Sequence, residues 1–351
     1  MRLIQVISLP AVLGSAFLAA LRPQVVVEYR EDLRLGKVDG TGPDVLGRVA
    51  AIEVDATGRI YVLDAPNARV VVFDSTGAVI RTIGRKGQGP GELEFPTRMT
   101  WARPNELVVI HAPGYAVFDT TGRFLRSVPR PSMAIQPPQI GSVANGAMCD
   151  MVNVRTDTTV VFAMIGDSVV SRLALARSPR AEVSFGPGRT IAAPFSTTAS
   201  YTIDCERRVV WKMDPTDSVV RVLGLRGDTV RRIAHGFARS TISASDRDAA
   251  IRQIAQETGA SITDLDRVTP RVGRYFSDAF VSREGDLWIA PSQPIDPRGR
   301  LYRILAPDGR VTSARLIPLY PAVRPVVVGR AVYGVVTDRD GVHYVVRRRR
   351  G

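Results

Sequence analysis

The residues that could carry out chemistry are few and widely spaced in this chain. The three histidines, His111, His235 and His343, stand far apart, without the short spacing that usually brings metal ligands together. No Gly-x-Ser-x-Gly elbow marks a serine nucleophile, and no pair of acidic residues stands out from the aspartates of turns. The sequence therefore holds no local catalytic motif, while a site assembled from distant segments stays open.

A glycine-rich segment, Gly84 to Glu92, has the composition of a phosphate-binding loop. Such a loop needs a strand before it and a helix N-terminus after it, so that amide groups and the helix dipole converge on the anion. Here Phe95-Pro96 and another strand pattern follow instead. We therefore interpret the glycines as residues that permit a sharp return from one strand to the next.

The net charge of +13 invites comparison with proteins that bind nucleic acids. Only Lys37, Lys86 and Lys212 are lysines, and the arginines that supply the rest of the positive charge are scattered. The single dense run, Arg347 to Arg350, stands beside the C-terminus, where we interpret it as a solvated tail. Because no aromatic platform for stacking bases accompanies the charge, nucleic acid is not expected as a partner.

Residues 1–20 have the composition of a signal peptide. Arg2 supplies a positive charge, the segment 3–20 carries no charged residue, and Ala16 to Ala20 offers small residues for cleavage. The alternative is an uncleaved membrane anchor, which Pro10 disfavours because it interrupts the apolar run. We expect export to the periplasm or to the outside of the cell, and no membrane span after the signal is removed.

The remaining chain, residues 21–351, is expected to form one domain, because a single closed repeat architecture can absorb that length. Two cysteines, Cys149 and Cys205, fall within it. In an oxidising compartment they could pair, but two cysteines are far fewer than a disulfide scaffold needs. Whether they pair stays open.

A repeated phrase gives the strongest structural signal. Val72 to Gly77, Val-Phe-Asp-Ser-Thr-Gly, returns as Val117 to Gly122, Val-Phe-Asp-Thr-Thr-Gly, and weaker copies fill most of the chain. An apolar strand that ends in Asp, a turn with Gly and a second apolar strand form one antiparallel hairpin, which cannot bury its own faces. Radial repetition of such units gives a β-propeller.

The pattern predicts six blades of four strands. The clearest blade has strands at 51–54, 59–63, 69–73 and 79–83. The other predicted blades span about 98–128, 140–176, 200–233, 275–318 and 326–349. The third of the six is poorly patterned, so five or seven blades stay open as alternatives.

The last blade offers only three strands. The apolar run Val25 to Tyr29, near the other end of the mature chain, has no partner in the first blade and can supply the fourth strand. Mixing strands from both ends in one blade would close the ring and remove its open sheet edges.

One insertion, at about 236–272 between the fourth and fifth blades, has a helical pattern. Ser245 is a candidate N-cap and Gly259 a candidate C-cap, and a second helix is expected from Ser261 to before Pro270. The apolar stripe of the first helix consists of Ala250, Ile251, Ile254 and Ala255. The insertion is expected either to cover the mouth of the central channel or to fill a gap beside a blade.

Residues 47–122 resemble a known family. The connector Gly84 to Glu92, the phrase Ile60 to Asp64 and the strand Arg69 to Asp74 are similar to NHL repeats. The layout resembles the bacterial exported six-bladed β-propellers related to NHL-repeat proteins. The resemblance implies an all-β, six-bladed, NHL-like propeller closed by mixing the N- and C-terminal strands in one blade. The poorly patterned third blade departs from it.

Strand order assigns the candidate site to one face of this propeller. If strands run from inner to outer, the loops between second and third strands share a face with the connectors between blades, whereas the first and last turns share the other. The connector face is the richer in polar residues. Its candidate binding residues are Asp64, Asn67, Arg85, Lys86, Glu92 and Arg98.

A rigid ring that presents many loops suits a binding or scaffold protein, so we expect a protein, peptide or glycan ligand and no catalysis. The alternative is a hydrolase or lyase with a metal such as calcium in the central channel, as in some six-bladed relatives. Glu53, Asp55 and Asp204 are its candidate ligands, although the last two are also turn residues. A third alternative is an anion-binding protein that uses the excess of arginine.

Overall fold

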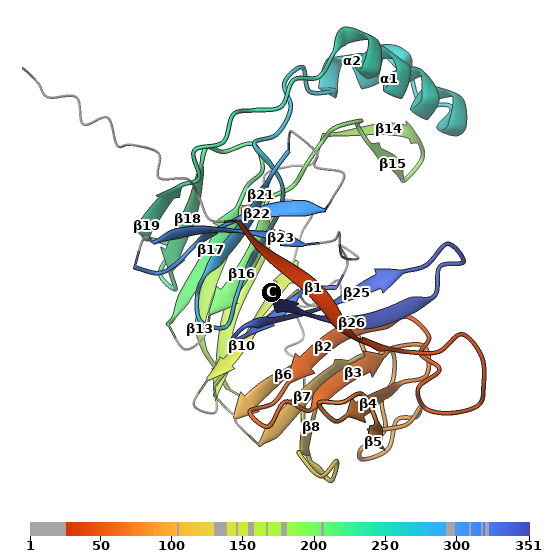
Figure 1. The fold of residues 1–351 in the computed structure, drawn as a ribbon. Helices are drawn as coiled ribbons and strands as arrows, with labels where there is room; N and C mark the ends of the chain where they lie inside the picture. The colour runs from red at the N-terminus through yellow and green to blue at the C-terminus, as the bar shows by residue number, and fades with distance from the viewer. Residues whose placement is uncertain are drawn as a thin grey trace, which may run out of the picture.

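The computed structural model describes residues 26–103, 105–129, 139–144, 147–153, 158–165, 168–176, 181–204, 207–292, 299–308, 310–316, 319 and 323–351. Within them the chain is almost entirely β-structure, with two helices (Figure 1). The predicted signal peptide and Cys205 lie outside these residues, so the signal peptide and the cysteine pairing stay predictions. Neither helix of the described chain is long and apolar enough to cross a membrane.

Four separate four-stranded antiparallel sheets follow the chain order, and we call them blades 1 to 4. Blade 1 consists of β2 (Val49–Val54), β3 (Ile60–Asp64), β4 (Arg69–Phe73) and β5 (Val79–Ile83), and blade 2 of β6 (Arg98–Arg103), β7 (Glu106–His111), β8 (Gly114–Asp119) and β9 (Phe124–Pro129). Blade 3 consists of β10 (Gln139–Ala144), β11 (Ala147–Asn153), β12 (Thr158–Ile165) and β13 (Ser168–Ala176), and blade 4 of β16 (Ser200–Asp204), β17 (Val209–Met213), β18 (Val219–Gly224) and β19 (Thr229–Ala234). The four strands predicted for blade 1 are confirmed within two residues at each end, and β10 to β13 occupy the span predicted for the third blade.

Eight further strands, β1 and β20 to β26, form one sheet rather than two separate blades. Blade 5 consists of β20 (Phe276–Val281), β21 (Leu287–Pro291), β22 (Arg300–Leu305) and β23 (Val311–Leu316). Blade 6 consists of β24 (Val326–Val328), β25 (Ala331–Thr337), β26 (His343–Arg350) and, as its outer strand, β1 (Val26–Leu35). The first residues of β1 pair in parallel with β23 and thereby join the two blades.

The mixing of strands from both ends in the last blade is confirmed, but the predicted segment is shifted. Tyr29 to Leu35 pairs with β26, from Tyr29 opposite Arg350 to Leu35 opposite Val345, whereas Val26 to Glu28 pairs with β23. The charged residues of β1 make the strand hard to recognise in the sequence, but in the structure two of them pair with arginines of β26. Glu31 and Asp32 of β1 form ion pairs with Arg348 and Arg347 of β26.

The interpretation of Arg347 to Arg350 as a solvated tail is wrong for its first half. Arg347 and Arg348 are buried, and the exposed fraction of Arg348 is only 1%. Arg347 donates to both carboxylate oxygens of Asp32, at 2.9 and 3.2 Å from Nε, and to the carbonyl oxygen of Ser75 at 2.7 Å. The arginine run therefore binds the N-terminal strand and blade 1 instead of extending into solvent.

The repeated Asp-x-Thr-Gly phrase forms the turns between outer strands. In one copy, Oδ1 of Asp119 accepts from the amide and hydroxyl of Thr121, at 2.9 and 2.6 Å, and from the amide of Arg123 at 3.0 Å. Asp74 makes the same three bonds with Thr76 and Ala78. The aspartate carboxylate therefore accepts hydrogen bonds from backbone amides of each turn, as the sequence predicts.

Apolar side chains pack between neighbouring blades. One cluster joins blades 1 and 2, a second joins blades 4 and 5, a third joins blades 5 and 6, and a fourth joins blades 6 and 1. The inner strand of blade 3, β10, contacts the inner strands β6 and β16 of its two neighbours. These contacts join blades that follow one another in the chain, and they also join blade 6 to blade 1.

The predicted helical insertion is present between β19 and β20. Helix α1 (Ala244–Thr258) is capped by Ser243 rather than Ser245, because the Ser243 side chain accepts from the amide of Asp246. Gly259 ends it in the left-handed conformation at φ 78°, as expected, and α2 (Ile262–Val268) follows Ser261 and stops before Pro270.

The two helices pack against a hairpin that the strand pattern did not predict. This hairpin, β14 (Glu182–Gly186) and β15 (Arg189–Ala192), lies between blades 3 and 4 in the chain. Val183 of the hairpin shares an apolar cluster with Ile251 and Leu265 of the helices, and Figure 1 shows the three elements grouped together. The insertion and the hairpin therefore form a small substructure with a core of its own.

Candidate functional site

The inner strands of five blades surround a cavity of about 480 Å³. Its walls come from β2, β6, β16 and β20 and from the segment 324–328, which contains β24. These are the first strands of their blades, so the cavity occupies the position of the central channel of a propeller. Its charged lining residues are Glu53, Asp55, Arg98, Asp204, Arg207, Arg283 and Arg324.

At one end of this channel, arginines connect the first turns of different blades. Arg207 of blade 4 donates to Asp204 at 2.6 Å and to the carbonyl oxygen of Glu284 in the turn of blade 5 at 3.2 Å. Arg283, in the same turn of blade 5, donates to the carbonyl oxygen of Val54 in blade 1 at 2.8 Å. We call this the turn end of the channel, and its contacts link blades 4, 5 and 1.

Glu53 completes the network at the turn end. Its carboxylate pairs with Arg283 and its side chain is only 13% exposed. Burial raises the pKa of Glu53, and the neighbouring charges of Arg283 and Arg324 oppose that rise. The positive charge of Arg283 therefore offsets part of the cost of burying the Glu53 carboxylate.

Arg324 reaches across the channel from the segment before β24. Its Nη2 donates to the hydroxyl of Thr202 in blade 4 at 2.9 Å and to the carbonyl oxygen of Val281 in blade 5 at 3.3 Å. Arg324 is exposed to water in the channel, and partial loss of hydration is the main cause that lowers its pKa to about 10. The charge of Arg98 lowers this pKa further, while Glu53 and Asp204 act in the opposite direction.

Asp55 lines the channel but is committed to its own turn. Its Oδ1 accepts from the amide and hydroxyl of Thr57, and its Oδ2 accepts from Arg59 at 2.6 Å and Tyr61 at 3.3 Å. Burial acts to raise the pKa of Asp55, but the hydrogen bonds from Thr57 and Arg59 outweigh it and the pKa is lowered. The turn interpretation of Asp55 explains the contacts of Oδ1, while Oδ2 also links the turn to Tyr61 of β3.

Two of the predicted binding residues, Asp64 and Asn67, have structural contacts. Asp64 is fully buried at the end of β3, where it accepts from the amide of Gly47 at 3.1 Å, from Asn67 at 2.8 Å and from Arg69 at 3.0 Å. Its carboxylate holds the chain that enters blade 1, while Asn67 itself is exposed.

Three further candidates, Arg85, Lys86 and Glu92, lie together on the glycine-rich connector. Arg85 Nε donates to Glu92 at 2.9 Å, and the amide of Gly89 donates to the same carboxylate at 2.9 Å. The bond from Gly89 is the first cause that lowers the pKa of Glu92, and Arg85 adds to it. Arg85 and Lys86 are exposed, so this connector presents positive charge to solvent.

The connector has the structure of a return loop. Strand β6 follows it instead of a helix, and Gly84 and Gly91 have φ of 73° and 77°. A Cβ on Gly84 would lie 2.7 Å from the Leu93 side chain. The glycines therefore serve the path of the chain, as the sequence predicts.

Of the six residues predicted for the connector face, Arg98 is the one that lines the channel, where the candidate metal ligands Glu53, Asp55 and Asp204 also lie. Arg98 stands at the start of β6, which is the end of the inner strand nearest the connector. Sequence reasoning missed Arg207, Arg283 and Arg324. The position of Arg324 in the sequence could have indicated its role. It stands just before the inner strand β24, much as Arg98 stands at the start of the inner strand β6.

The three histidines are structural acceptors in separate blades. Nδ1 of His111 accepts from the amide of Glu94 at 3.3 Å, and Nδ1 of His343 accepts from the amide of Val49 at 3.2 Å. His235 accepts from the amide of Phe237 at 3.2 Å. Burial is the first cause that lowers the pKa of each of them, which favours the neutral imidazole.

The described channel residues do not fit the metal alternative. Calcium takes six to eight oxygen ligands, whereas Glu53 and Asp204 each accept from an arginine and Asp55 belongs to its turn. Among the residues that the structure describes, no group of three or more His, Cys, Asp or Glu side chains could hold a metal ion.

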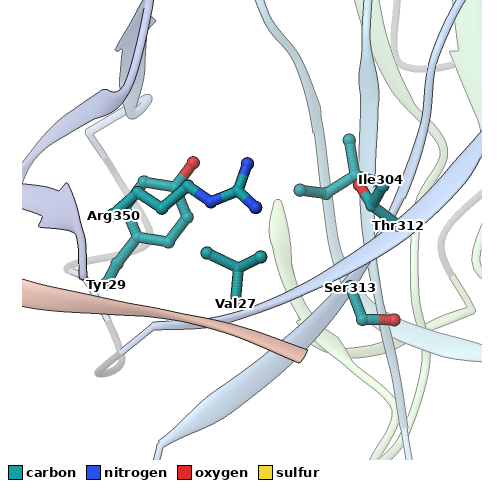
Figure 2. A pocket seen from close by; sticks show the side chains of 6 residues that line it. All are labelled: Val27, Tyr29, Ile304, Thr312, Ser313 and Arg350. Atoms are coloured by element: carbon teal, nitrogen blue, oxygen red, sulfur yellow. The ribbon is translucent and has the colours of Figure 1, made fainter. Parts of the chain in front are cut away.

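A smaller cavity, of about 100 Å³, lies where β1 leaves β23 for β26. Figure 2 shows the Arg350 side chain between Tyr29 and Ile304, above Val27. Thr312 and Ser313 of β23 complete the lining. Its volume is small for a ligand site, so we interpret it as the gap left where the strand changes partner.

Comparison with known proteins supports the class of fold. A family model described as a 6-bladed beta-propeller matches residues 44–126. A candidate exported protein from Bacteroides fragilis has a similar structure, with a TM-score of 0.50 and 14% identity over 95% of this chain and 97% of that chain. This protein therefore has a β-propeller fold, and its resemblance to the bacterial six-bladed propellers is confirmed. Its relation to NHL repeats stays a prediction.

Two other solved structures have lower scores. A protein from Bacteroides vulgatus is 10% identical, with a TM-score of 0.49 over 93% of this chain and 100% of that chain. Virginiamycin B lyase from Staphylococcus aureus is 11% identical, with a TM-score of 0.38 over 89% of this chain and 87% of that chain. At these values neither supports an inference about function. The curated proteins include no match to the sequence.

Proposed function

We propose that this protein is an exported binding module whose six blades close into a ring and hold a ligand in the central channel. The observation that carries the proposal is the cavity of about 480 Å³ between the inner strands of five blades. A concave site with a few convergent polar groups is the usual form of a ligand pocket in a rigid fold. The ligand class is a peptide, a protein segment or a glycan.

The two ends of the channel differ in a way that supports binding from the connector face. Arg207 and Arg283 hold the turn end together across blades 4, 5 and 1. Arg98 begins the inner strand β6, and the connector that precedes this strand carries the exposed residues Arg85 and Lys86. A ligand that projects a group into the channel would extend over these loops.

Phe95 adds an apolar contact to the connector face. Its side chain is 75% exposed although its backbone has φ of 47°, a conformation that costs a non-glycine residue stability. Aromatic side chains are frequent anchors in binding interfaces. Phe95 therefore gives the connector loops an apolar contact beside their charged ones.

A channel-filling substitution tests the proposal. Thr100 lines the channel in β6, two residues from Arg98 and on the same face of the strand, so Thr100→Trp would fill part of the cavity. Thr229→Trp, on the exposed outer strand β19, is the matched control. Arrays of defined peptides and glycans would first identify a ligand of the wild-type protein.

We expect Thr100→Trp to abolish binding of that ligand and Thr229→Trp to retain it. Melting temperatures of both variants would show that each is folded. Binding that survives in a folded Thr100→Trp variant would show that the channel is not the ligand site. Replacing Arg85, Lys86 and Phe95 together by Ala then measures how much the connector loops contribute to the affinity for the ligand.

A further inference from the structure

We propose that the open edge of blade 4 is a docking site for an acidic, extended segment of a partner protein, which pairs with β19 as an added strand. This edge is the outer strand of its blade and does not line the channel, so the inference is independent of the channel ligand. It is supported by the pairing of β1, by the contacts of arginines on other outer strands and by the charge that β19 presents.

Within this molecule, an acidic strand already pairs with sheet edges that carry arginine. Strand β1 pairs in parallel with β23, where Glu28 lies opposite Arg315 and their charged atoms are 3.0 Å apart. It then pairs with β26, where Glu31 lies opposite Arg348 and the charged atoms are 3.4 Å apart. In both places the backbone pairing is accompanied by a carboxylate directly opposite an arginine, which is a stabilising cross-strand pair.

Strand β19 also carries arginines, but no strand in the described part of the chain pairs with its outer side. It is the last strand in the sheet of blade 4, and Figure 1 shows it beyond β18 at the periphery of the molecule. An edge strand directs the N–H and C=O groups of alternate residues toward its open side. Because Thr229 to Arg232 are all exposed, an extended segment can reach these groups.

The arginines of β19 differ from those of two other open outer strands. On β5, Arg81 donates to a backbone carbonyl of blade 2 at 2.8 Å, and on β9, Arg126 forms an ion pair with Glu106 at 2.8 Å. Among the residues that the structure describes, the side chains of Arg231 and Arg232 have neither a hydrogen bond nor an ion pair. The guanidinium groups of β19 are therefore available to an added strand.

The neighbouring strands of blade 4 add to the positive charge of this edge. Arg232 lies directly opposite Arg221 of β18, and Arg221 lies directly opposite Lys212 of β17. In the described chain, Arg221 is the only one of these three with an ion-pair partner, Asp217 at 2.7 Å. Like charges directly opposite one another are destabilising. A carboxylate on an added strand, next to Arg232, would offset this repulsion.

The charge of β19 also restricts which segments can pair with it. A second copy of β19 would bring arginines against arginines, so the edge is protected from pairing with itself. Successive side chains of a strand point to opposite faces, so two successive acidic residues would place one carboxylate beside Arg231 and the other beside Arg232. The extra residue Val230 interrupts the register, which leaves residues 231–234 for regular pairing. Strand β1 likewise uses only residues 26–28 on β23.

Fluorescence anisotropy with labelled peptides tests the inference on the mature protein at low salt. The acidic probe has the sequence Thr-Val-Thr-Glu-Glu-Val-Thr-Val. A neutral analogue has glutamine in place of both glutamates. A proline analogue keeps the glutamates but has proline in place of every valine, so it keeps the charge and loses the N–H groups that strand pairing needs. A heparin oligosaccharide serves as an anion without a peptide backbone.

The test variant combines Arg231→Gln with Arg232→Gln. The matched control combines Arg252→Gln with Arg339→Gln, which removes the same charge from exposed positions in α1 and in the turn between β25 and β26. We expect the wild-type protein and the control to bind the acidic probe, with an affinity that falls as salt is added. The test variant should bind it about tenfold more weakly, because both cross-strand ion pairs are lost. Melting temperatures would show that both variants are folded.

The two analogues should also bind the wild-type protein about tenfold more weakly than the acidic probe, whereas Thr100→Trp should leave binding of the probe unchanged. No saturable binding of the acidic probe, or equal affinity in the test and control variants, would overturn the inference. Equal binding of the proline analogue, or tighter binding of heparin that is lost in the test variant, would show that the arginines bind anions without strand pairing. Loss of probe binding in Thr100→Trp would assign the probe to the channel and reject the docking site.

Discussion

Shortening Leu35 tests how firmly the N-terminal strand is held in the last blade. Leu35 is 3% exposed and belongs to the apolar cluster that joins blades 6 and 1. Leu35→Ala removes three carbon atoms from this cluster, at about 0.8 kcal/mol each, and leaves a cavity that adds to the loss. We expect the free energy of unfolding to fall by about 3 kcal/mol.

Urea unfolding followed by tryptophan fluorescence measures this change. With a slope of about 3 kcal/mol per molar urea, the midpoint should fall by about 1 M. The matched control is Val79→Ala on the outer strand β5, where the side chain is 36% exposed and the expected loss is below about 0.5 kcal/mol. Equal, small losses in both variants would show that β1 does not dock as described, because a peripheral strand can lose a leucine at little cost.

Three further predictions concern turns and the channel. Gly122→Ala should destabilise the protein more than Gly188→Ala. Both glycines have positive φ, but of the two only Gly122 would bring a Cβ against a side chain, that of Ile83 at 2.9 Å. The melting temperatures of the two variants measure this difference. Arg283→Met should destabilise the protein more than Glu53→Gln at pH 7, since only Arg283→Met leaves the buried Glu53 carboxylate without its ion-pair partner. Equal losses of unfolding free energy in urea would contradict this. Hydrogen bonds from Thr121 are the first cause that lowers the pKa of Asp119 to about 2, so its stabilisation is present above about pH 4 and is lost as the pH falls toward 2. Asp119→Asn should therefore cost about 1 kcal/mol at pH 7 and progressively less below pH 4 in urea unfolding, whereas a constant difference would refute the assignment.

The repeated turns made most of the strands predictable. Asp55, Asp74 and Asp119 mark their turns by residue type, because Oδ1 of each carboxylate accepts hydrogen bonds from residues two and four positions later. Local chemistry of this kind can be read from a single sequence. The register of β1 could not be read so directly, since the partners of Glu31 and Asp32 stand at the other end of the chain.

The candidate site was predicted only in part, for a related reason. Arg98 was selected as a polar residue of the connector face and lies in the channel wall. The role of Arg324 depends on Thr202 and Val281, which belong to two other blades, and no local pattern relates these three residues. Asp64 was selected as a polar loop residue, but its contacts with Gly47 and Arg69 make it part of the scaffold.

The outer strand of the last blade also sets the order in which the molecule can be completed. The ribosome makes β1 first, whereas its antiparallel partner β26 is made last. Until β26 is made, the part of β1 from Tyr29 to Leu35 lacks its antiparallel partner and is an open strand edge. A chain that is cut short before β26 would keep this edge exposed to chaperones and proteases. Pairing of β1 with β26 thus reports that β26 has been made, and it separates molecules with a complete sixth blade from shorter fragments that have several well-formed blades.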